Sequence, residues 1–366
     1  MRDFSEAQRV VVKIGTHTLT KGASVDAAYF RQVAGQVKGL IDAGKQVVII
    51  TSGAIGMGAG QLELEEKPTG MEMRQACAAI GQPLLMQEYR KAFGRYDITV
   101  AQVLLTAEVL DHRKTYLNLR NAIETLLKLG VVPILNENDS ISTAEIGTAF
   151  GDNDKLSALV ASKIDADLLI MLTDIDALYD KNPNEHTDAK AIRAVFEITD
   201  EIVANAGGSG SRHATGGMKT KIEAARIAAQ AGCRLVLAHG RAKDIITRIM
   251  AGEEIGTIFM PKRKLSNRTR WILNSQPAGT IHIDDGAMKA LRNHKSLLPS
   301  GIVSVEGDFK AGDIVLLNDA AKAMTSLDAA QLRSLAGKHS TEIKKALGPD
   351  HRDVVAIPED IVFIEH

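Results

Sequence analysis

The chain has 366 residues, 45% of them hydrophobic and 24% charged, a composition typical of a globular protein with about two domains. Its 44 Lys and Arg nearly balance 45 Asp and Glu, so a net charge of -1 provides no general basic field for a polyanion. The N-terminus lacks the apolar core of a signal peptide, no apolar run approaches the ~18 residues of a membrane span, and two cysteines cannot build a disulfide framework. We therefore expect a cytoplasmic protein without a membrane segment.

The first 260 residues alternate apolar strand patterns with helical ones. Strands are predicted at residues 10–14, 46–51, 99–105, 131–135, 168–172 and 235–238. Helices are predicted at residues 30–41, 117–129, 156–164 and 218–231. Near-continuous apolar strands separated by helices predict an α/β fold, with a mainly parallel sheet covered by helices on both faces. Ligands of such sheets bind beyond the carboxyl ends of the strands, which is where the polar and glycine-rich segments of this sequence fall.

The pattern changes after residue 260. Residues 261–276 carry five basic side chains and no acidic one, and are interpreted as a basic linker. From residue 277 to 366, short alternating strands near 280–283, 302–305, 314–317 and 361–364 predict a small β-rich domain. The expected organisation is thus a catalytic domain at 1–260, the linker at 261–276, and the β-rich domain at 277–366.

Familiar catalytic motifs are absent. The chain has no Walker phosphate-binding loop, no properly spaced dinucleotide fingerprint, no His or Cys pair at zinc-ligand spacing and no nucleophile elbow. These absences disfavour hydrolase triads and zinc enzymes.

Two predicted strands end in residues suited to phosphate. Lys13 leaves a buried strand beside Gly15, so a cation and an approachable backbone adjoin each other. Ser52 and Gly53 follow the strand at 46–51, which gives an anion-binding geometry if a helix begins there. Either pair alone is equally consistent with an ordinary strand end.

The densest polar cluster lies between residues 136 and 154. Asn136-Glu137-Asn138-Asp139 ends one strand and Gly151-Asp152-Asn153-Asp154 opens the next helix, so that seven of eight residues carry a carboxylate or a carboxamide. A turn and a helix cap account for two or three of them. The remainder predicts a site for a polar ligand.

Two further segments are weaker. Thr173 and Asp174 end the strand at 168–172, where a plain turn explains them equally well. A glycine-rich stretch at 207–210 is followed by Thr215-Gly216-Gly217-Met218-Lys219-Thr220-Lys221, which starts a helix. Free backbone N–H groups and two lysines at a helix start favour phosphate binding, although a surface linker would have a similar composition.

Taken in order, the segments around Lys13, Ser52, Asn136, Asp154, Thr173 and Lys221 resemble the glutamate 5-kinases of the amino-acid kinase family. The tail, with Pro277-Ala278-Gly279 and residues 298–302, resembles a PUA domain. The resemblance implies an amino-acid kinase fold joined to a small PUA-like barrel. It also implies ATP-dependent phosphorylation of the side-chain carboxylate of L-glutamate, with Mg²⁺, to L-glutamyl 5-phosphate in the first step of proline biosynthesis.

The resemblance also implies residue roles. Lys13 and Lys221 would contact ATP phosphates, and Asp154 would organise the two lysines. The expected glutamate-binding residues are Ser52, Gly53, Asn136, Asp139 and Asn153, with Asp139 pairing with the substrate ammonium. The expected ATP-binding residues are Lys13, Gly15, Thr173, Asp174, Thr215, Gly216, Gly217, Met218, Lys219, Thr220 and Lys221. The sequence departs from the family pattern at His17, where serine is usual, and at Ala177, where glycine is usual.

The family resemblance further implies a homo-oligomer, dimer or tetramer, feedback inhibition by proline, and hand-over of a labile acyl phosphate to glutamate-5-semialdehyde dehydrogenase. Within the same fold, kinases for acetylglutamate, aspartate or uridylate remain alternatives. RNA binding is a third reading, because PUA modules commonly bind RNA. It is disfavoured because residues 277–366 hold more acidic than basic side chains and no aromatic platform for bases.

Overall fold

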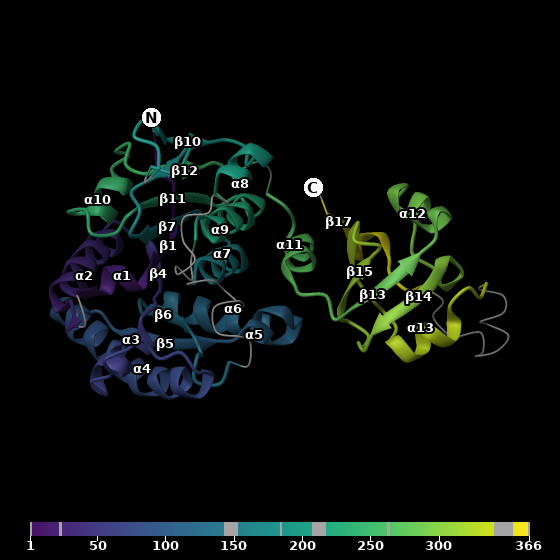
Figure 1. Cartoon of the computed structure of the whole chain (residues 1–366), viewed down its shortest axis with the longest axis horizontal. Helices are drawn as coiled ribbons and strands as arrows, with labels where there is room; N and C mark the ends of the chain where they lie inside the picture. Colours follow the sequence, from purple (N-terminus) through teal and green to yellow (C-terminus); the bar gives the residue numbers. More distant parts are fainter. Residues whose placement is uncertain are drawn as a thin grey trace. The chain divides into compact units, whose positions relative to one another are not determined.

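The computed structural model describes residues 2–21, 24–142, 153–183, 185–206, 217–261, 264–339 and 354–364. The chain divides into two compact units, Met1–Lys264 and Leu265–His366 (Figure 1). No helix among the described residues is long and apolar enough to cross a membrane.

The first unit is built on an eight-stranded sheet whose strand order is β10-β12-β11-β7-β1-β4-β6-β5. Its strands are β1 (Arg9–Ile14), β4 (Gln46–Ile50), β5 (Val100–Leu105), β6 (Val132–Glu137), β7 (Leu168–Thr173), β10 (Ala194–Val195), β11 (Arg234–His239) and β12 (Thr257–Phe259). All neighbours pair in parallel except β11 and β12. Two small ribbons pair β2 (Thr20–Lys21) with β3 (Ser24–Val25) and β8 (Leu178–Tyr179) with β9 (Ala191–Ile192).

Helices cover both faces of this sheet. They are α1 (Thr16–Leu19), α2 (Ala27–Asp42), α3 (Ala54–Gln61), α4 (Met71–Phe93), η1 (Gly94–Tyr96), α5 (Ala107–Asp111), α6 (Arg113–Lys128), α7 (Asp154–Lys163), α8 (Asp200–Ala206), α9 (Met218–Gln230) and α10 (Ile245–Met250). One buried apolar cluster joins the sheet to α2, α3, α4 and α10, and a second joins it to α6, α7 and α9. Helices α7 and α9 lie side by side (Figure 1).

The alternation of β1 decides where its lysine points. Val10, Val12 and Ile14 belong to the first apolar cluster, whereas Val11 belongs to the second. Because successive strand residues face opposite sides, Lys13 shares the face of Val11, beneath α7 and α9. Strand β1 lies between β4, the next strand of this sheet along the chain, and β7, which the chain reaches only after β5 and β6 on the β4 side. The direction in which the sheet grows therefore reverses between β1 and β7. That arrangement is a switch point, where α/β sheets bind ligands.

The second unit contains a five-stranded sheet in the order β14-β13-β15-β16-β17. Its elements are α11 (Asn267–Asn274), β13 (Gly279–Ile283), α12 (Asp285–Arg292), η2 (Pro299–Gly301), β14 (Ile302–Gly307), β15 (Ile314–Leu317), β16 (Ala321–Met324), α13 (Ala329–Leu335), η3 (Pro358–Asp360) and β17 (Ile361–Phe363). All neighbouring strands are antiparallel except β13 and β15. This unit has its own buried apolar core.

The predicted α/β fold is confirmed, and each predicted strand of the first unit has a counterpart within two residues at either end. Several elements were not predicted, and two of them, α4 and α11, bear on the site and on the division of the chain. Helix α4 is absent from the sequence analysis, and α11 lies inside the segment interpreted as a linker. Ser266 caps α11 by accepting a hydrogen bond from the Thr269 N–H, and Trp271 packs against Ile314. An apolar anchor therefore turns part of the basic segment into a packed helix of the second unit.

Candidate functional site

Two lysines meet one carboxylate at the carboxyl edge of the sheet. The Nζ of Lys13, at the end of β1, lies 2.7 Å from Asp154 Oδ1, and both side chains are fully buried. The Nζ of Lys221, in the first turns of α9, lies 3.0 Å from Asp154 Oδ2. Asp154 is the first residue of α7, so β1, α7 and α9 each contribute one charge. The predicted catalytic residues Lys13, Asp154 and Lys221 are thus brought together.

The electrostatics of this trio favour an anionic ligand. Burial alone would raise the pKa of Asp154, but the charges of Lys13 and Lys221 outweigh it and hold that pKa below its ordinary value. The carboxylate therefore stays ionised beside the two lysines. Two cations that converge on one point suit an anion such as a phosphate.

The start of α9 lies at the same point. Thr220 Oγ1 is 3.0 Å from Asp154 Oδ2 and 2.8 Å from the Gly217 carbonyl. Lys219 is exposed to solvent and Met218 is half-buried. Thr215 and Gly216 of the predicted nucleotide segment lie outside the described residues, as do Gly151, Asp152 and the glycines at 207–210.

Three carboxamides connect α7, β6 and α4. Asn153 stands in the left-handed conformation with φ 63°, directly before α7. Its Nδ2 donates to the Thr51 carbonyl at 2.7 Å and to Asn136 Oδ1 at 2.9 Å, and lies 3.3 Å from Ser52 Oγ. The Nδ2 of Asn136 in turn donates to Gln82 Oε1 at 2.8 Å. Asn153, Asn136 and Ser52, all predicted substrate-binding residues, therefore form one network.

Gln82 was missed by the sequence analysis. It lies on α4, which passes so close to α3 that a Cβ on Gly81 would sit 1.8 Å from the Ala54 carbonyl oxygen. Only glycine allows this approach, and it places the next residue, Gln82, beside the start of α3. The available signal was a glutamine directly after a segment rich in small residues, Ala76-Cys77-Ala78-Ala79-Ile80-Gly81.

Tyr89, also on α4, contacts Thr51, the residue that directly follows strand β4. Its side chain is fully buried, and its hydroxyl donates to Thr51 Oγ1 at 2.9 Å. Burial raises the pKa of Tyr89, so the hydroxyl stays protonated and remains a donor. The segment from Thr51 to Gly53 is therefore fixed by α4 and by Asn153 together.

An acidic pocket lies next to this network. It is lined by Ala54, Ala78, Gln82, Leu104, Glu137, Asn138, Asp139 and Ser140. Burial, together with the nearby charge of Asp139, raises the pKa of Glu137 to about 7. Burial also raises the pKa of Asp139 to about 6, and in both cases the charge of Arg74 opposes the rise. Two partly desolvated carboxylates make this pocket suited to a ligand ammonium.

Two glycines were predicted to offer backbone N–H groups. Gly53 has φ 95°, a conformation that favours glycine, and it starts α3, so the helix expected after this segment is present. The N–H of Gly15 donates to the Leu172 carbonyl at 3.0 Å. In this structure the neighbouring strand β7 uses this N–H, and phosphate binding at Gly15 stays a prediction. Gly15 still ends β1 without a side chain beside Lys13.

The carboxyl end of β7 carries Thr173 and Asp174. The Thr173 hydroxyl donates to Asp174 Oδ1 at 2.8 Å. Partial burial would raise the pKa of Asp174, but this hydrogen bond and the charges of His17 and Lys221 lower it. His17 is exposed near this edge and Ala177 is buried, so neither departure removes a group from the site.

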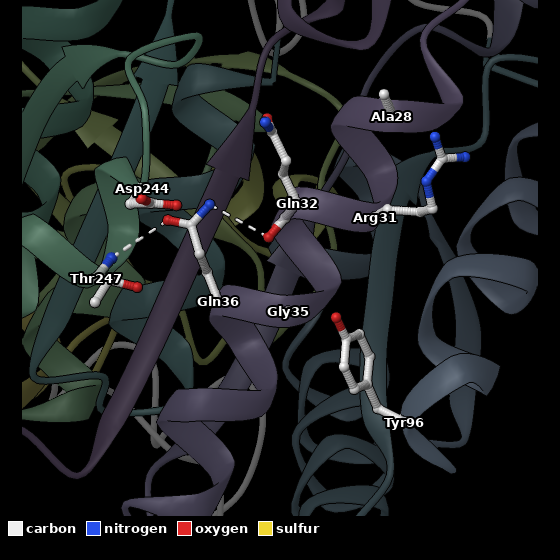
Figure 2. Close-up of a pocket in the computed structure, with 8 residues that line it drawn as sticks. All are labelled: Ala28, Arg31, Gln32, Gly35, Gln36, Tyr96, Asp244 and Thr247. Carbon is white, nitrogen blue, oxygen red and sulfur yellow. Dashed lines mark hydrogen bonds between the residues drawn. The ribbon is translucent and has the colours of Figure 1, made fainter.

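A different pocket, lined by residues of α2, η1 and the start of α10, takes no part in this cluster (Figure 2). Gln36 Oε1 accepts a hydrogen bond from the Ile246 N–H at 2.8 Å and from the Thr247 N–H at 3.4 Å. Its Nε2 donates to the Gln32 carbonyl at 3.3 Å. The side-chain amide of Gln36 therefore links α10 to α2.

Comparisons with known proteins agree with this geometry. The model of the amino acid kinase family matches residues 8–239, and the PUA domain model matches residues 279–347. A glutamate 5-kinase of Methanosarcina mazei is 46% identical, covering 99% of this chain and 97% of its own. One from Caldanaerobacter subterraneus subsp. tengcongensis is 43% identical, covering 98% of each chain. A carbamate kinase from Giardia lamblia bound to AMP-PNP shares the fold, with a TM-score of 0.52 and 16% identity over 70% of this chain and 100% of its own.

Proposed function

This chain belongs to the amino acid kinase family and, within it, to the glutamate 5-kinases, and we propose that Lys13, Asp154 and Lys221 are the centre at which it phosphorylates L-glutamate. The reaction transfers the γ-phosphoryl group of ATP to the side-chain carboxylate and forms L-glutamyl 5-phosphate. The observation that carries this proposal is that one buried carboxylate binds two lysines at the point where β1 ends and α7 and α9 begin.

The two lysines supply charge where the reaction needs it. Phosphoryl transfer proceeds with negative charge spread over the transferring oxygens, and catalysis consists mainly of alignment and charge stabilisation. Lys13 and Lys221 would bind these oxygens from two sides, since their Nζ atoms flank the same carboxylate. Because the site is buried, each charge acts more strongly than it would in water.

Asp154 is a positioning residue in this scheme. Its two oxygens fix the two ammonium groups, while the Thr220 hydroxyl lies beside Oδ2. An ionised Asp154 keeps the lysines charged and separated before substrate arrives. The site is then preorganised, so little rearrangement is needed as charge develops on the phosphoryl group.

The acceptor lies on the β4 and β6 side of the same edge. We assign the substrate ammonium to Asp139 and its partner Glu137, whose raised pKa values reflect burial that the charge of Arg74 does not outweigh. Ser52, Gly53, Asn136 and Asn153 lie between this pocket and Asp154. Glutamate would therefore extend from the acidic pocket towards the lysines, with its side-chain carboxylate leading.

No general base is required. A glutamate side chain has a reference pKa of ~4.3, so its carboxylate is already ionised near neutral pH and attacks phosphorus directly. One oxygen of the carboxylate forms the new P–O bond as the bond to the ADP oxygen breaks. The proposed centre accordingly consists of lysines and an aspartate rather than a poised histidine.

ATP is the phosphoryl donor of kinases, and we assign its phosphates to Lys13, Lys221 and the start of α9, with Thr173 and Asp174 nearby. The described residues contain no group of three or more His, Cys, Asp or Glu that could hold a metal. We therefore propose that Mg²⁺ enters with the nucleotide, since this ion commonly keeps its waters and binds through phosphates. When bound, it would neutralise part of the phosphate charge.

The wider setting is inferred from the family. We place the reaction in the cytoplasm, as the first step of proline biosynthesis, with proline as feedback inhibitor and a dimer or tetramer as the working form. The acyl phosphate product is labile, which favours direct use by glutamate-5-semialdehyde dehydrogenase. The relatives at 43–46% identity favour glutamate over acetylglutamate, aspartate or uridylate as acceptor.

An acceptor panel tests the proposal. The protein is incubated with Mg-ATP, hydroxylamine and either L-glutamate, N-acetyl-L-glutamate, L-aspartate or UMP, and both hydroxamate and ADP are measured. We expect hydroxamate with glutamate alone, because hydroxylamine traps its acyl phosphate. ADP release only with another acceptor would show that glutamate is not the substrate. No turnover with any acceptor would refute the proposed kinase reaction.

A further inference from the structure

We propose that Gln82 binds the acceptor: its Nε2 donates a hydrogen bond to the α-carboxylate of the amino acid, in a subsite completed by Arg74. This inference rests on the proposed function and extends it. It names the side chain that distinguishes an amino acid with a free α-carboxylate from one whose α-carboxylate is modified. Both residues lie on α4 and neither was indicated by a motif.

A backbone carbonyl fixes the orientation of Gln82. The Thr51 carbonyl can only accept, so the group of Asn153 that faces it must be the Nδ2 amide. That amide then requires an acceptor from Asn136, which must present Oδ1 and turn its own Nδ2 towards Gln82. Gln82 must in turn offer Oε1 there. Its Nε2 is therefore directed away from the network.

The Nε2 of Gln82 lacks a partner. The atom is buried and makes no hydrogen bond to any residue that the structure describes. The whole residue is only 8% exposed, and it lines the acidic pocket together with Glu137 and Asp139. A buried amide donor without an acceptor destabilises a protein, because the group has lost its hydrogen bonds to water. A ligand that offers an oxygen in this pocket would remove that penalty.

The α-carboxylate is the substrate oxygen group that fits. With the side-chain carboxylate at the lysines and the ammonium at Asp139, only the α-carboxylate remains to be satisfied. Arg74 lies on the same face of α4 as Ala78 and Gln82, because residues four apart stack on one side of a helix. Its guanidinium lowers the pKa of Glu137 and Asp139, and its buried Nε bonds to no described residue. It is the cation expected opposite a carboxylate.

The test uses two acceptors and one isosteric substitution. L-glutamate is compared with its α-amide, in which a neutral carboxamide replaces the α-carboxylate, by ADP release at saturating Mg-ATP. We expect the wild-type KM for the amide to exceed that for glutamate by about 10–100-fold, from loss of a charge-assisted hydrogen bond. Equal KM values would overturn the subsite without the need for any variant.

Gln82→Glu then assigns the effect to this residue. The new carboxylate still accepts from Asn136 but repels the α-carboxylate, so glutamate KM should rise at least ~10-fold while the α-amide is bound relatively better. The ATP KM should change by less than about twofold. Gln87→Glu, the same change at an exposed position of α4, should alter neither acceptor.

A structural role predicts a different pattern. If Gln82 served only to orient Asn136, Gln82→Glu would weaken both acceptors by the same factor, and that result would overturn the proposal. Thermal unfolding checks that the variant is folded, and Gln82→Met, which removes the donor without adding charge, replaces it if it is not. Wild-type protein that fails to phosphorylate glutamate at all would instead reject the proposed function.

Discussion

Lys13 Nζ and Asp154 Oδ1 lie 2.7 Å apart with both side chains fully buried, so this ion pair is formed out of contact with solvent. Lys221 adds a second cation on the opposite oxygen. Buried ion pairs of this kind contribute little net stability, because desolvation offsets most of the attraction. Their presence at the switch point of the sheet is therefore better explained by a requirement for charge than by a requirement for stability.

Removing either lysine should abolish most of the activity. Lys13→Ala and Lys221→Ala are each expected to lower turnover by ~10² or more, by analogy with the loss of one preorganised donor. Turnover is measured as glutamate-dependent ADP release at saturating substrates. Lys38→Ala, at a half-buried lysine of α2 outside the site, is the control and should behave like the wild type. Near-normal turnover in either active-site variant would remove that lysine from the mechanism.

The glutamate KM should depend on pH through Asp139. This carboxylate must be ionised to pair with the substrate ammonium, and burial raises its pKa to about 6. We expect the glutamate KM to rise about tenfold per pH unit as the pH falls below about 6, and to level off above about 7. Steady-state kinetics between pH 5 and 8 at saturating Mg-ATP give this profile.

Asp139→Ala supplies the matching variant. It should raise the glutamate KM by about 10–100-fold, leave the ATP KM nearly unchanged, and flatten the pH profile. Asp42→Ala, at an exposed carboxylate of α2, controls for loss of charge alone. Equal effects on the two substrates would show that Asp139 does not belong to the acceptor site.

Glu137 should make the ligand-free protein less stable at neutral than at acidic pH. Its pKa rises to about 7 from an ordinary value of 4.5, so the folded state holds the proton more tightly than the unfolded state. The free energy of unfolding should therefore decrease as the pH rises from about 4.5 to about 7. Glu137→Gln should match the wild type near pH 4 and exceed its stability at pH 8, as measured by urea denaturation. A variant less stable than the wild type at pH 8 would contradict this interpretation.

Much of the sheet follows from simple patterns, and the buried lysine near the end of β1 illustrates why. Val10, Val11 and Val12 form an uninterrupted apolar run, as expected of a strand buried on both faces, and Lys13 marks its polar end. The clustering of carboxylates and carboxamides after Leu135 and before Lys155 likewise indicated a site. These signals are local in sequence, so they can be recognised without knowledge of the tertiary structure.

Helix α4 could not be identified in this way. Its sequence has no clear apolar stripe, and Pro83 stands inside it. What holds it in place is contact with α3 through Gly58 and Gly81, which becomes visible only when both helices are placed. The roles of Gln82 and Tyr89 were therefore hidden, as was the use of the Gly15 N–H by the neighbouring strand.

The close packing of α3 on α4 gives a test within one helix. A Cβ on Gly58 would lie 1.9 Å from the Cys77 carbonyl oxygen, whereas a Cβ on Gly56 would meet nothing within 4 Å. Gly58→Ala should therefore lower the free energy of unfolding by about 1–3 kcal/mol, because the added methyl group overpacks the contact between α3 and α4. Gly56→Ala should be neutral or stabilising by up to about 1 kcal/mol, because alanine is the better helix former. Equal effects in chemical denaturation would contradict the close helix contact.

The central claim is that a side-chain carboxylate oxygen of glutamate attacks the γ-phosphorus of ATP. Glutamate labelled with ¹⁸O in that carboxylate is incubated with the protein, Mg-ATP and hydroxylamine, and the released phosphate is examined by mass spectrometry. Hydroxylamine attacks the acyl carbon, so the phosphate leaves with the oxygen that bridged it to glutamate. The account predicts one ¹⁸O atom per released phosphate, whereas unlabelled phosphate would show transfer to water and contradict it.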